Sequence, residues 1–150
     1  MTEPSPIKTL LDLAQNRLDD ATRRLGELIA GEHECQKKLQ LLEDYRTEYQ
    51  ERFLEAARNG IGPDAWRNFS VFIGRIDDAI AIQRQALDQS RQAIVGGQEA
   101  WVAQRNKVKA FDTLNQRQHT AQVRREQRDE QRQSDEHAAK TFRDRPPEAD

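Results

Sequence analysis

The feature that most constrains this chain is an apolar repeat at alternating spacings of three and four residues, which runs from Leu11 to Ala56. Twelve of its fourteen positions are apolar, and only Glu32 and Arg46 interrupt it. A mean spacing of about 3.5 residues keeps one stripe of a helix facing a partner helix while the two supercoil. A single amphipathic helix of a globular core rarely keeps this register for so long. The repeat therefore predicts a coiled-coil helix that needs a partner.

A second repeat, with the same spacings in reverse order, supplies that partner. It consists of Trp66, Phe69, Ile73, Ile76, Ile80, Gln83, Leu87, Ser90, Ile94, Gly97, Trp101, Gln104, Val108 and Phe111. If the chain folds back about Ile61, the expected layers include Ala56 with Trp66, Phe53 with Phe69, Tyr49 with Ile73, Leu42 with Ile80, Leu28 with Ile94, Leu25 with Gly97 and Leu11 with Phe111. The small Ala21 then meets Trp101, and the polar Glu32 meets Ser90. Because sizes and polarity match, we expect an intramolecular antiparallel hairpin.

The ends of the two helices carry residues that favour helix starts and stops. Ser5 is suited to cap the first helix, and Pro6 to its first position. Residues 59–63 form the breaker cluster between the repeats, in which Gly60 favours a left-handed helix end. Asp64 is then expected to cap the second helix.

The second helix is expected to extend beyond the first, because the apolar repeat finds no partner after Phe111. Residues 112–142 contain no Pro or Gly and are polar nearly all round. They predict a projecting helix, a segment that packs on another protein, or a frayed end. The expected fold is all-α: a single domain over 1–150 that forms a long two-helix antiparallel coiled-coil hairpin with an overhanging C-terminal helix. Its parts are a helix at about 6–58, a turn at 59–63, a helix at about 64–142 and a disordered tail at 143–150.

Composition agrees with helices that each bury one apolar stripe. Charged residues make up 33% of the 150 residues, and the mean hydropathy is −1.00, which leaves too little apolar material for a compact globule. The net charge of −2 disfavours a nucleic-acid-binding surface. The single cysteine, Cys35, lies on the apolar repeat, so we expect a buried and inert thiol. No stretch approaches the ~20 apolar residues of a membrane span, and no charged leader precedes an apolar run, so a cytoplasmic protein is expected.

The sequence carries no pattern typical of catalysis. It has no Walker loop, GxGxxG, CxxC or HExxH. The three histidines, His33, His119 and His137, lie far apart in the sequence and have no cysteines or carboxylates at metal-ligand spacing. A two-helix hairpin also offers no deep cavity that excludes water. We therefore expect no enzyme, no catalytic residue, no metal and no cofactor.

Aromatic and small residues flank the apolar repeat on one side. In the heptad positions of an antiparallel pair, Tyr45 and Phe72 fall on the same side, beside Ala79. They either form a binding patch or thicken the hairpin near its turn, and the pattern alone does not choose between these. A row of alanines continues along this side at Ala79, Ala86, Ala93 and Ala100. It allows either tight packing within the hairpin or a slot for a third helix.

Several segments in order along the chain are similar to a known family. They are LLDLAQNRLDDATRRLGEL at 10–28, LLEDYRTEYQ at 41–50, NGI at 59–61, WRNFSVFI at 66–73 and AFDTLNQRQ at 110–118. On these segments the chain resembles FliJ, the coiled-coil component of the bacterial flagellar type III export apparatus, over about residues 7–140. The resemblance implies a two-helix antiparallel coiled coil similar in shape to the central stalk of rotary ATPases.

The resemblance also implies partners, a binding site and a location. FliJ-like proteins bind the hexameric export ATPase (FliI-like), the linker of the large membrane subunit of the export gate (FlhA-like), and export chaperones. A protein of this kind lies at the cytoplasmic face of the inner membrane through the export apparatus. The alternative function is a chaperone-like scaffold for export substrates or their chaperones, without a direct ATPase role. Carried over to this sequence, the gate-binding cluster is Lys38, Leu42, Tyr45, Tyr49, Phe72, Ile76, Ala79 and Gln83.

Overall fold

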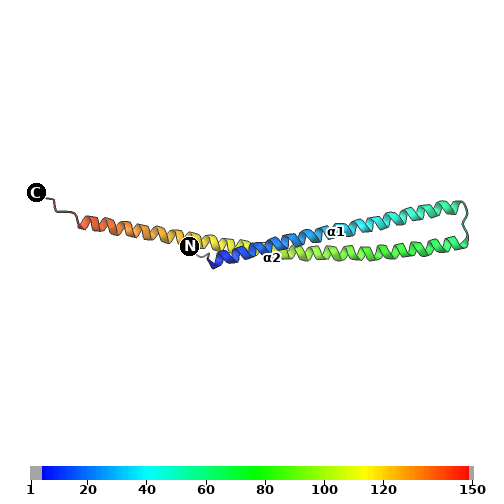
Figure 1. Ribbon diagram of the computed structural model, residues 1–150, viewed down its shortest axis with the longest axis horizontal. Coiled ribbons are helices and arrows are strands. Elements are labelled where there is room, and N and C mark those ends of the chain that lie inside the picture. Colours follow the sequence, from blue (N-terminus) through cyan, green and yellow to red (C-terminus); the bar gives the residue numbers. More distant parts are fainter. Residues whose placement is uncertain (1–4, 149–150) are drawn as a thin grey trace. The chain divides into compact units, whose positions relative to one another are not determined.

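The computed structural model describes residues 5–148 and contains two helices. Helix α1 spans Pro6–Arg58 with 53 residues, and α2 spans Pro63–Arg143 with 81 residues (Figure 1). No strand occurs among the described residues. The predicted all-α fold with two long, mutually packed helices is confirmed, and the helix ends lie within one residue of those expected from the sequence.

The helix ends follow the capping residues in all but one case. The Lys8 amide donates to Ser5 Oγ over 3.2 Å, which caps α1 as expected. Gly60 has a φ of +86°, the left-handed conformation that glycine adopts without strain after a helix. The prediction for Asp64 is wrong, because α2 already begins at Pro63. Proline favours the first helical position, so Asp64 lies inside the first turn, where its carboxylate still faces the positive end of the helix dipole.

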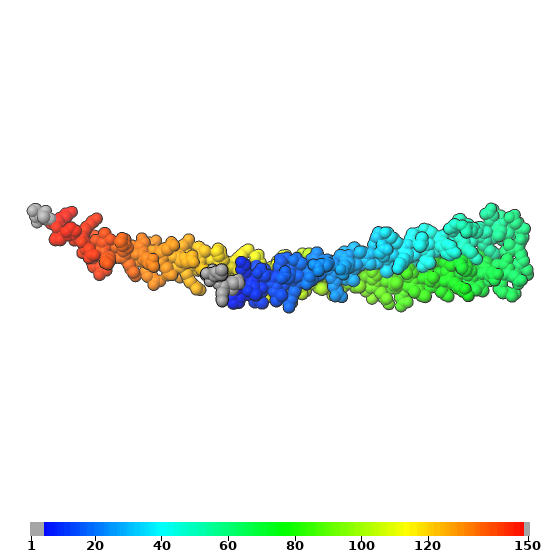
Figure 2. Space-filling model, viewed as in Figure 1, coloured from blue at the N-terminus to red at the C-terminus, as the bar shows by residue number. Residues whose placement is uncertain are grey.

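The chain divides into two compact units, each of which is described by itself. The hairpin unit is Arg17–Gln104, and the terminal unit combines Met1–Asn16 with Arg105–Asp150. In the hairpin unit α1 and α2 run side by side in opposite directions from the loop that joins them (Figures 1 and 2).

The layers of the hairpin unit follow the pairing expected from the two repeats. The rings of Phe53 and Phe69 stack with centroids 3.7 Å apart. A Cβ added to Gly97 would lie 3.4 Å from Leu25 Cδ1 and 2.7 Å from Leu28 Cδ1. Phe53 with Phe69 and Leu25 with Gly97 are pairs expected from the sequence spacing, whereas Leu28, expected opposite Ile94, also reaches Gly97. The most buried residues of this unit are Ile76, Ile80 and Leu87, each exposed by 6% or less.

Two positions differ from the expectation: the layer nearest the loop, and Cys35 in the seam, which is the line of repeat residues along which the two helices meet. Ala56 is exposed, and Trp66 is 57% exposed. The Trp66 ring still lies 5.2 Å from that of Phe53, but no further layer follows before the loop to cover the large indole. Cys35 is half-buried rather than buried, and the residue that contacts it from α2 is the polar Gln83, whose side-chain amide donates to the Cys35 carbonyl.

In the terminal unit only the first part of α2 has buried or half-buried residues. Ala14 is buried at 4% exposure, and Leu11, Val108 and Phe111 are half-buried. From Gln116 to Glu148 every residue is exposed, and the helix nevertheless continues to Arg143. This segment is therefore a polar helix that the terminal unit leaves uncovered.

Candidate protein-binding site

Two lines of α2 residues at seven-residue steps define two sides of the hairpin unit. One line holds Asp77, Arg84 and Arg91, and the other holds Phe72, Ala79, Ala86 and Ala93. Residues 77 and 79 lie about 200° apart around the helix, since each residue turns it by about 100°. The two lines therefore flank opposite edges of the seam, and the two sides have different chemistry.

The first, called the ion-pair side, is bridged between the helices by charged residues. Arg84 Nη2 lies 3.3 Å from Glu43 Oε1, and Arg91 Nε lies 3.3 Å from Glu32 Oε1. Glu32, expected in one layer with Ser90, forms its ion pair with Arg91, the next residue along α2. Glu32 and Arg46, the two positions that interrupt the apolar repeat, both form ion pairs on this side.

The second of those positions, Arg46, forms a two-pronged pair with Asp77 on this side. Its Nη2 lies 3.4 Å from Asp77 Oδ2, while its Nε donates to Oδ1. The hydrogen bond from the guanidinium, helped by its charge, lowers the pKa of the Asp77 carboxyl below its ordinary value. The same contact raises the pKa of Arg46. The pair is open to solvent, so it contributes only modestly to folding.

The opposite side, called the aromatic side, is bridged by rings instead of charges. Phe72 of α2 lies between two tyrosines of α1, with ring centroids 6.2 Å from Tyr45 and 4.5 Å from Tyr49. Tyr49 also stacks on Phe69 at 5.5 Å. Tyr45 is 46% exposed, and Phe72 is half-buried. These rings both thicken the hairpin and present aromatic surface, which combines the two alternatives that the sequence left open.

The eight residues carried over from the family resemblance all lie on the seam or on its aromatic side. They differ in what they present to a partner: Lys38 and Tyr45 are exposed, Leu42, Tyr49, Phe72, Ala79 and Gln83 are half-buried, and Ile76 is buried. The Gln83 side-chain amide donates to the Cys35 carbonyl of α1 over 3.1 Å. Ile76 and Gln83 therefore serve the hairpin itself, while the exposed surface centres on Tyr45.

Two further residues on this side were missed by the sequence reasoning. Leu41 is 70% exposed and Ile82 is 69% exposed, which are high values for aliphatic side chains. Leu41 lies three residues after Lys38 and four before Tyr45, and Ile82 lies three after Ala79. The spacing places both on the aromatic side. A search of the flanks for apolar residues at spacings of three and four would have found them.

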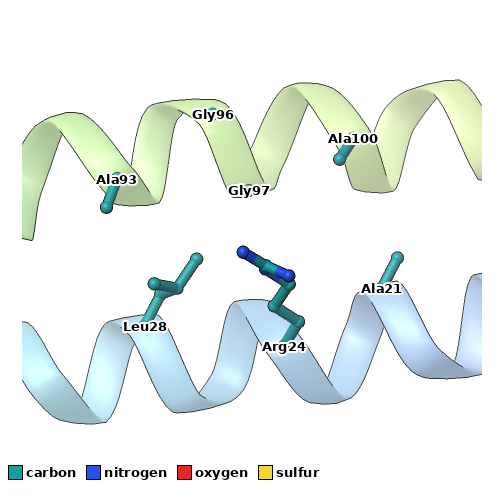
Figure 3. A pocket seen from close by; sticks show the side chains of 7 residues that line it. All are labelled: Ala21, Arg24, Leu28, Ala93, Gly96, Gly97 and Ala100. Atoms are coloured by element: carbon teal, nitrogen blue, oxygen red, sulfur yellow. The ribbon is translucent and has the colours of Figure 1, made fainter.

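Further from the loop, the aromatic side continues as a shallow groove of about 400 Å³ (Figure 3). Its lining residues are Ala21, Arg24, Leu28, Ala93, Gly96, Gly97 and Ala100. The Arg24 side chain extends across the groove toward α2 (Figure 3). Ala93 and Ala100 are exposed, so in this half the alanine row leaves an open groove.

The described residues contain no group suited to hold a metal. No three His, Cys, Asp or Glu side chains among residues 5–148 lie together in a way that could ligate an ion. Neither α1 nor α2 has a stretch apolar and long enough to cross a membrane. At its surface the hairpin unit presents rings, aliphatic side chains and charges.

Known proteins resemble this chain over nearly its whole length. The family model described as "Flagellar FliJ protein" matches residues 3–147. The chain belongs to the FliJ family. A protein of Escherichia coli (strain K12) named "Flagellar FliJ protein" is 33% identical over 146 residues, covering 97% of this chain and 99% of that protein. A protein of Salmonella typhi with the same name is 32% identical over 146 residues, with the same coverage.

Membership confirms the resemblance seen in the sequence. The match spans both units and the loop that joins α1 to α2 within the hairpin unit, so it does not rest on one run of heptads. A FliJ family member is a non-catalytic flagellar protein, and this gives the chain a role connected with flagellar export.

Proposed function

We propose that this protein is a non-enzymatic component of flagellar type III export that binds two other parts of the apparatus. The hairpin unit binds the linker of the export gate's large membrane subunit through its aromatic side. The terminal unit binds the hexameric export ATPase as a stalk. Export chaperones are further partners, and the protein acts at the cytoplasmic face of the inner membrane through these contacts.

The observation that carries the gate contact is the exposed ring of Tyr45 beside Phe72. Aromatic residues contribute disproportionately to protein interfaces, and a cluster at the centre of a patch contributes most. Here the cluster spans both helices, with the Tyr45 and Phe72 rings 6.2 Å apart. The fold already holds it in place, so binding loses little side-chain entropy.

The support for the ATPase contact is the uncovered end of α2. Residues from Gln116 to Arg143 are helical and exposed on every face. A helix that is polar all round gains little from burial within its own chain. A helix of this kind suits insertion into a polar channel of a partner, as a stalk requires.

The test of the gate contact measures two affinities on one variant. The purified chain is titrated with the cytoplasmic region of the gate subunit and, separately, with the export ATPase. Replacing Tyr45→Ala and Phe72→Ala is expected to weaken gate binding by ~10-fold or more, and to leave ATPase binding unchanged. The control, Glu43→Gln with Arg84→Gln, removes an exposed pair from the ion-pair side and is expected to change neither affinity. Loss of both affinities in the aromatic variant would contradict the two-site division.

The test of the ATPase contact removes residues 116–150. These residues cover nothing that the structure describes, so the hairpin unit is expected to keep its thermal melting curve. Stimulation of the ATPase is expected to be lost. Unchanged stimulation would favour the alternative function, a chaperone-like scaffold without a direct ATPase role.

A further inference from the structure

We propose that the hairpin unit contains a weak section, residues 24–31 of α1 and 93–100 of α2, at which the two helices open locally while the part nearer the loop stays folded. The weak section is a conformational device built into the fold. The inference goes beyond the proposed function and does not depend on it, because it concerns the hairpin alone and involves no partner.

Glycines are concentrated in the weak section. Four of the seven glycines of the chain lie there: Gly26, Gly31, Gly96 and Gly97. The two stretches face each other, because a Cβ added to Gly97 would lie within 3.4 Å of both Leu25 and Leu28 of α1. Glycine inside a helix is less stable than alanine, since its backbone loses more freedom on folding. Both helices are therefore weakened at the same cross-section of the hairpin.

Packing requires only one of these glycines. A Cβ on Gly97 would lie 2.7 Å from Leu28 Cδ1, so alanine would push that side chain away. Cβ atoms on Gly26, Gly31 and Gly96 would meet nothing within 4 Å. Alanine would fit at these three positions and would strengthen both helices. The low helix propensity of this section is therefore not a by-product of close packing between α1 and α2.

Side-chain contacts do not compensate for the glycines. No residue of the weak section forms a side-chain hydrogen bond or an ion pair with any residue that the structure describes. The contacts of Arg91 with Glu32 and of Trp101 with Thr22 flank the section on its two sides. Nearer the loop, by contrast, charged pairs and stacked rings join the helices. The weak section is held together by its seam side chains alone.

The seam is also poorly covered in the weak section. None of its residues is buried, and the shallow groove of about 400 Å³ lies between its two helices (Figure 3). The least exposed residues of the hairpin unit, Ile76, Ile80 and Leu87, all lie nearer the loop. Segments with few buried apolar contacts open at a lower free energy than the domain as a whole. The weak section is therefore expected to open first within the hairpin unit.

Opening of the weak section leaves the aromatic side in place. Tyr45, Tyr49 and Phe72 all lie between the weak section and the loop. The ring contacts among them do not involve residues 24–31 or 93–100. The hairpin can thus loosen or bend away from the loop while it keeps the aromatic side folded, since glycine pairs in helices are common places for a bend.

Hydrogen exchange of the backbone amides tests the proposal on the full chain. After correction for intrinsic rates, amides of residues 24–31 and 93–100 are expected to exchange ~100-fold faster than those of residues 76–87. Their exchange should depend little on low concentrations of urea, because local opening exposes less surface than global unfolding does. Equal protection of the two regions would overturn the proposal.

Substitution of the glycines tests the cause of the opening. Gly26→Ala, Gly31→Ala and Gly96→Ala in one chain are expected to slow exchange in the weak section by ~10-fold or more, because each alanine strengthens its helix without a clash. Gly96→Ala alone should slow it by ~3-fold. The matched control is Gly74→Ala, whose added Cβ also meets nothing within 4 Å but lies nearer the loop. It is expected to leave exchange in the weak section unchanged.

Proteolysis gives a second readout of the same opening. A protease that cleaves after glutamate can attack Glu27 and Glu99 in the weak section, and Glu48 and Glu51 nearer the loop. All four side chains are exposed, so differences in cleavage report on opening of the helix around them. Of these four sites, Glu27 and Glu99 are expected to be cut first, and the three alanines should delay their cleavage.

The remaining outcomes separate the proposal from uniform fraying of the hairpin. Exchange in the weak section that the three alanines leave unchanged would overturn it. So would an equal effect of Gly74→Ala and Gly96→Ala on that exchange. Earlier cleavage at Glu48 or Glu51 than at Glu27 and Glu99 would show that the hairpin opens elsewhere.

Discussion

The two sides of the hairpin unit share one seam and use it differently. The ion-pair side joins the helices through Arg46 with Asp77, Glu43 with Arg84, and Glu32 with Arg91. The aromatic side joins them through Tyr45, Tyr49 and Phe72. On the first side opposite charges meet across the helices. On the second, rings meet across the helices and leave part of their surface exposed.

This difference shows how a two-helix rod can carry specificity. A rod has no cavity in which to build a site, so a partner can recognise it only by which side it meets. Cross-helix pairs of opposite charge fix the register of the helices, while surface aromatics supply contact area at low entropic cost. Variants that affect the seam should damage both sides together, and variants on one side should leave the other intact.

The largest loss of stability is expected from substitutions in the seam, which lies beneath both sides. Leu87→Ala removes one of the most buried side chains, 6% exposed, and should destabilise the chain by about 2–5 kcal/mol. Leu42→Ala should cost less, because Leu42 is half-buried. Urea unfolding of both variants measures the difference, and a larger loss from Leu42→Ala would show that the burial pattern of the seam is wrong.

A pair of neighbouring glycines tests the groove on the aromatic side. A Cβ on Gly96 meets nothing within 4 Å, so Gly96→Ala should stabilise the helix by up to about 1 kcal/mol. A Cβ on Gly97 would lie 2.7 Å from Leu28 Cδ1. Gly97→Ala should lose that gain, because Leu28 has to move and its packing suffers. Thermal melts of the two variants should differ in this order, and equal melting would mean that Leu28 does not pack against Gly97.

A smaller effect is expected on the ion-pair side. Glu32 is the seam position that accepts a contact from Arg91. Glu32→Leu should leave stability within about 1 kcal/mol or raise it, since an exposed pair contributes little and leucine restores the apolar repeat. Binding at the aromatic side should not change. A large loss of stability on melting would show that the pair holds the register.

The smallest effect is expected in how the stability of the fold changes with pH under acidic conditions. Because Arg46 lowers the pKa of Asp77 in the folded chain, the pair stabilises folding above the carboxyl's ordinary pKa of about 3.9. That contribution is lost as the pH falls through this value toward the lower pKa of the folded state. Asp77→Asn should therefore reduce the loss of stability between neutral and acidic pH. Asp78→Asn is the control, since Asp78 makes no ion pair among the described residues. Identical acid profiles for the two variants would contradict the effect.

Much of the fold followed from the sequence because the helical repeat fixes geometry. Once the seam positions were identified, the reversal at residues 59–63 determined which residues meet, and Phe53 with Phe69 met as expected. The charged partners did not follow in the same way. Long flexible side chains reach past their own layer, and so the ion pair of Glu32 is with Arg91.

The candidate site followed from the sequence only in part. The side on which Tyr45 and Phe72 meet could be derived from heptad positions. The exposure of Leu41 and Ile82 could not, because it depends on what covers each flank of a helix. Ile76 belongs to the same set of residues but is buried, so residues that share one side of the hairpin are not all accessible to a partner.

The two tryptophans give this protein a built-in spectroscopic readout of its two ends. The Trp101 indole donates to Thr22 Oγ1 over 2.9 Å and is half-buried, whereas Trp66 near the loop is 57% exposed. Emission from Trp66 should therefore be the more red-shifted and the more readily quenched by acrylamide. With Trp66→Phe or Trp101→Phe, the remaining indole reports separately on the loop end and on the opposite end of the hairpin unit. Events at each end can then be followed by intrinsic fluorescence, without an attached dye.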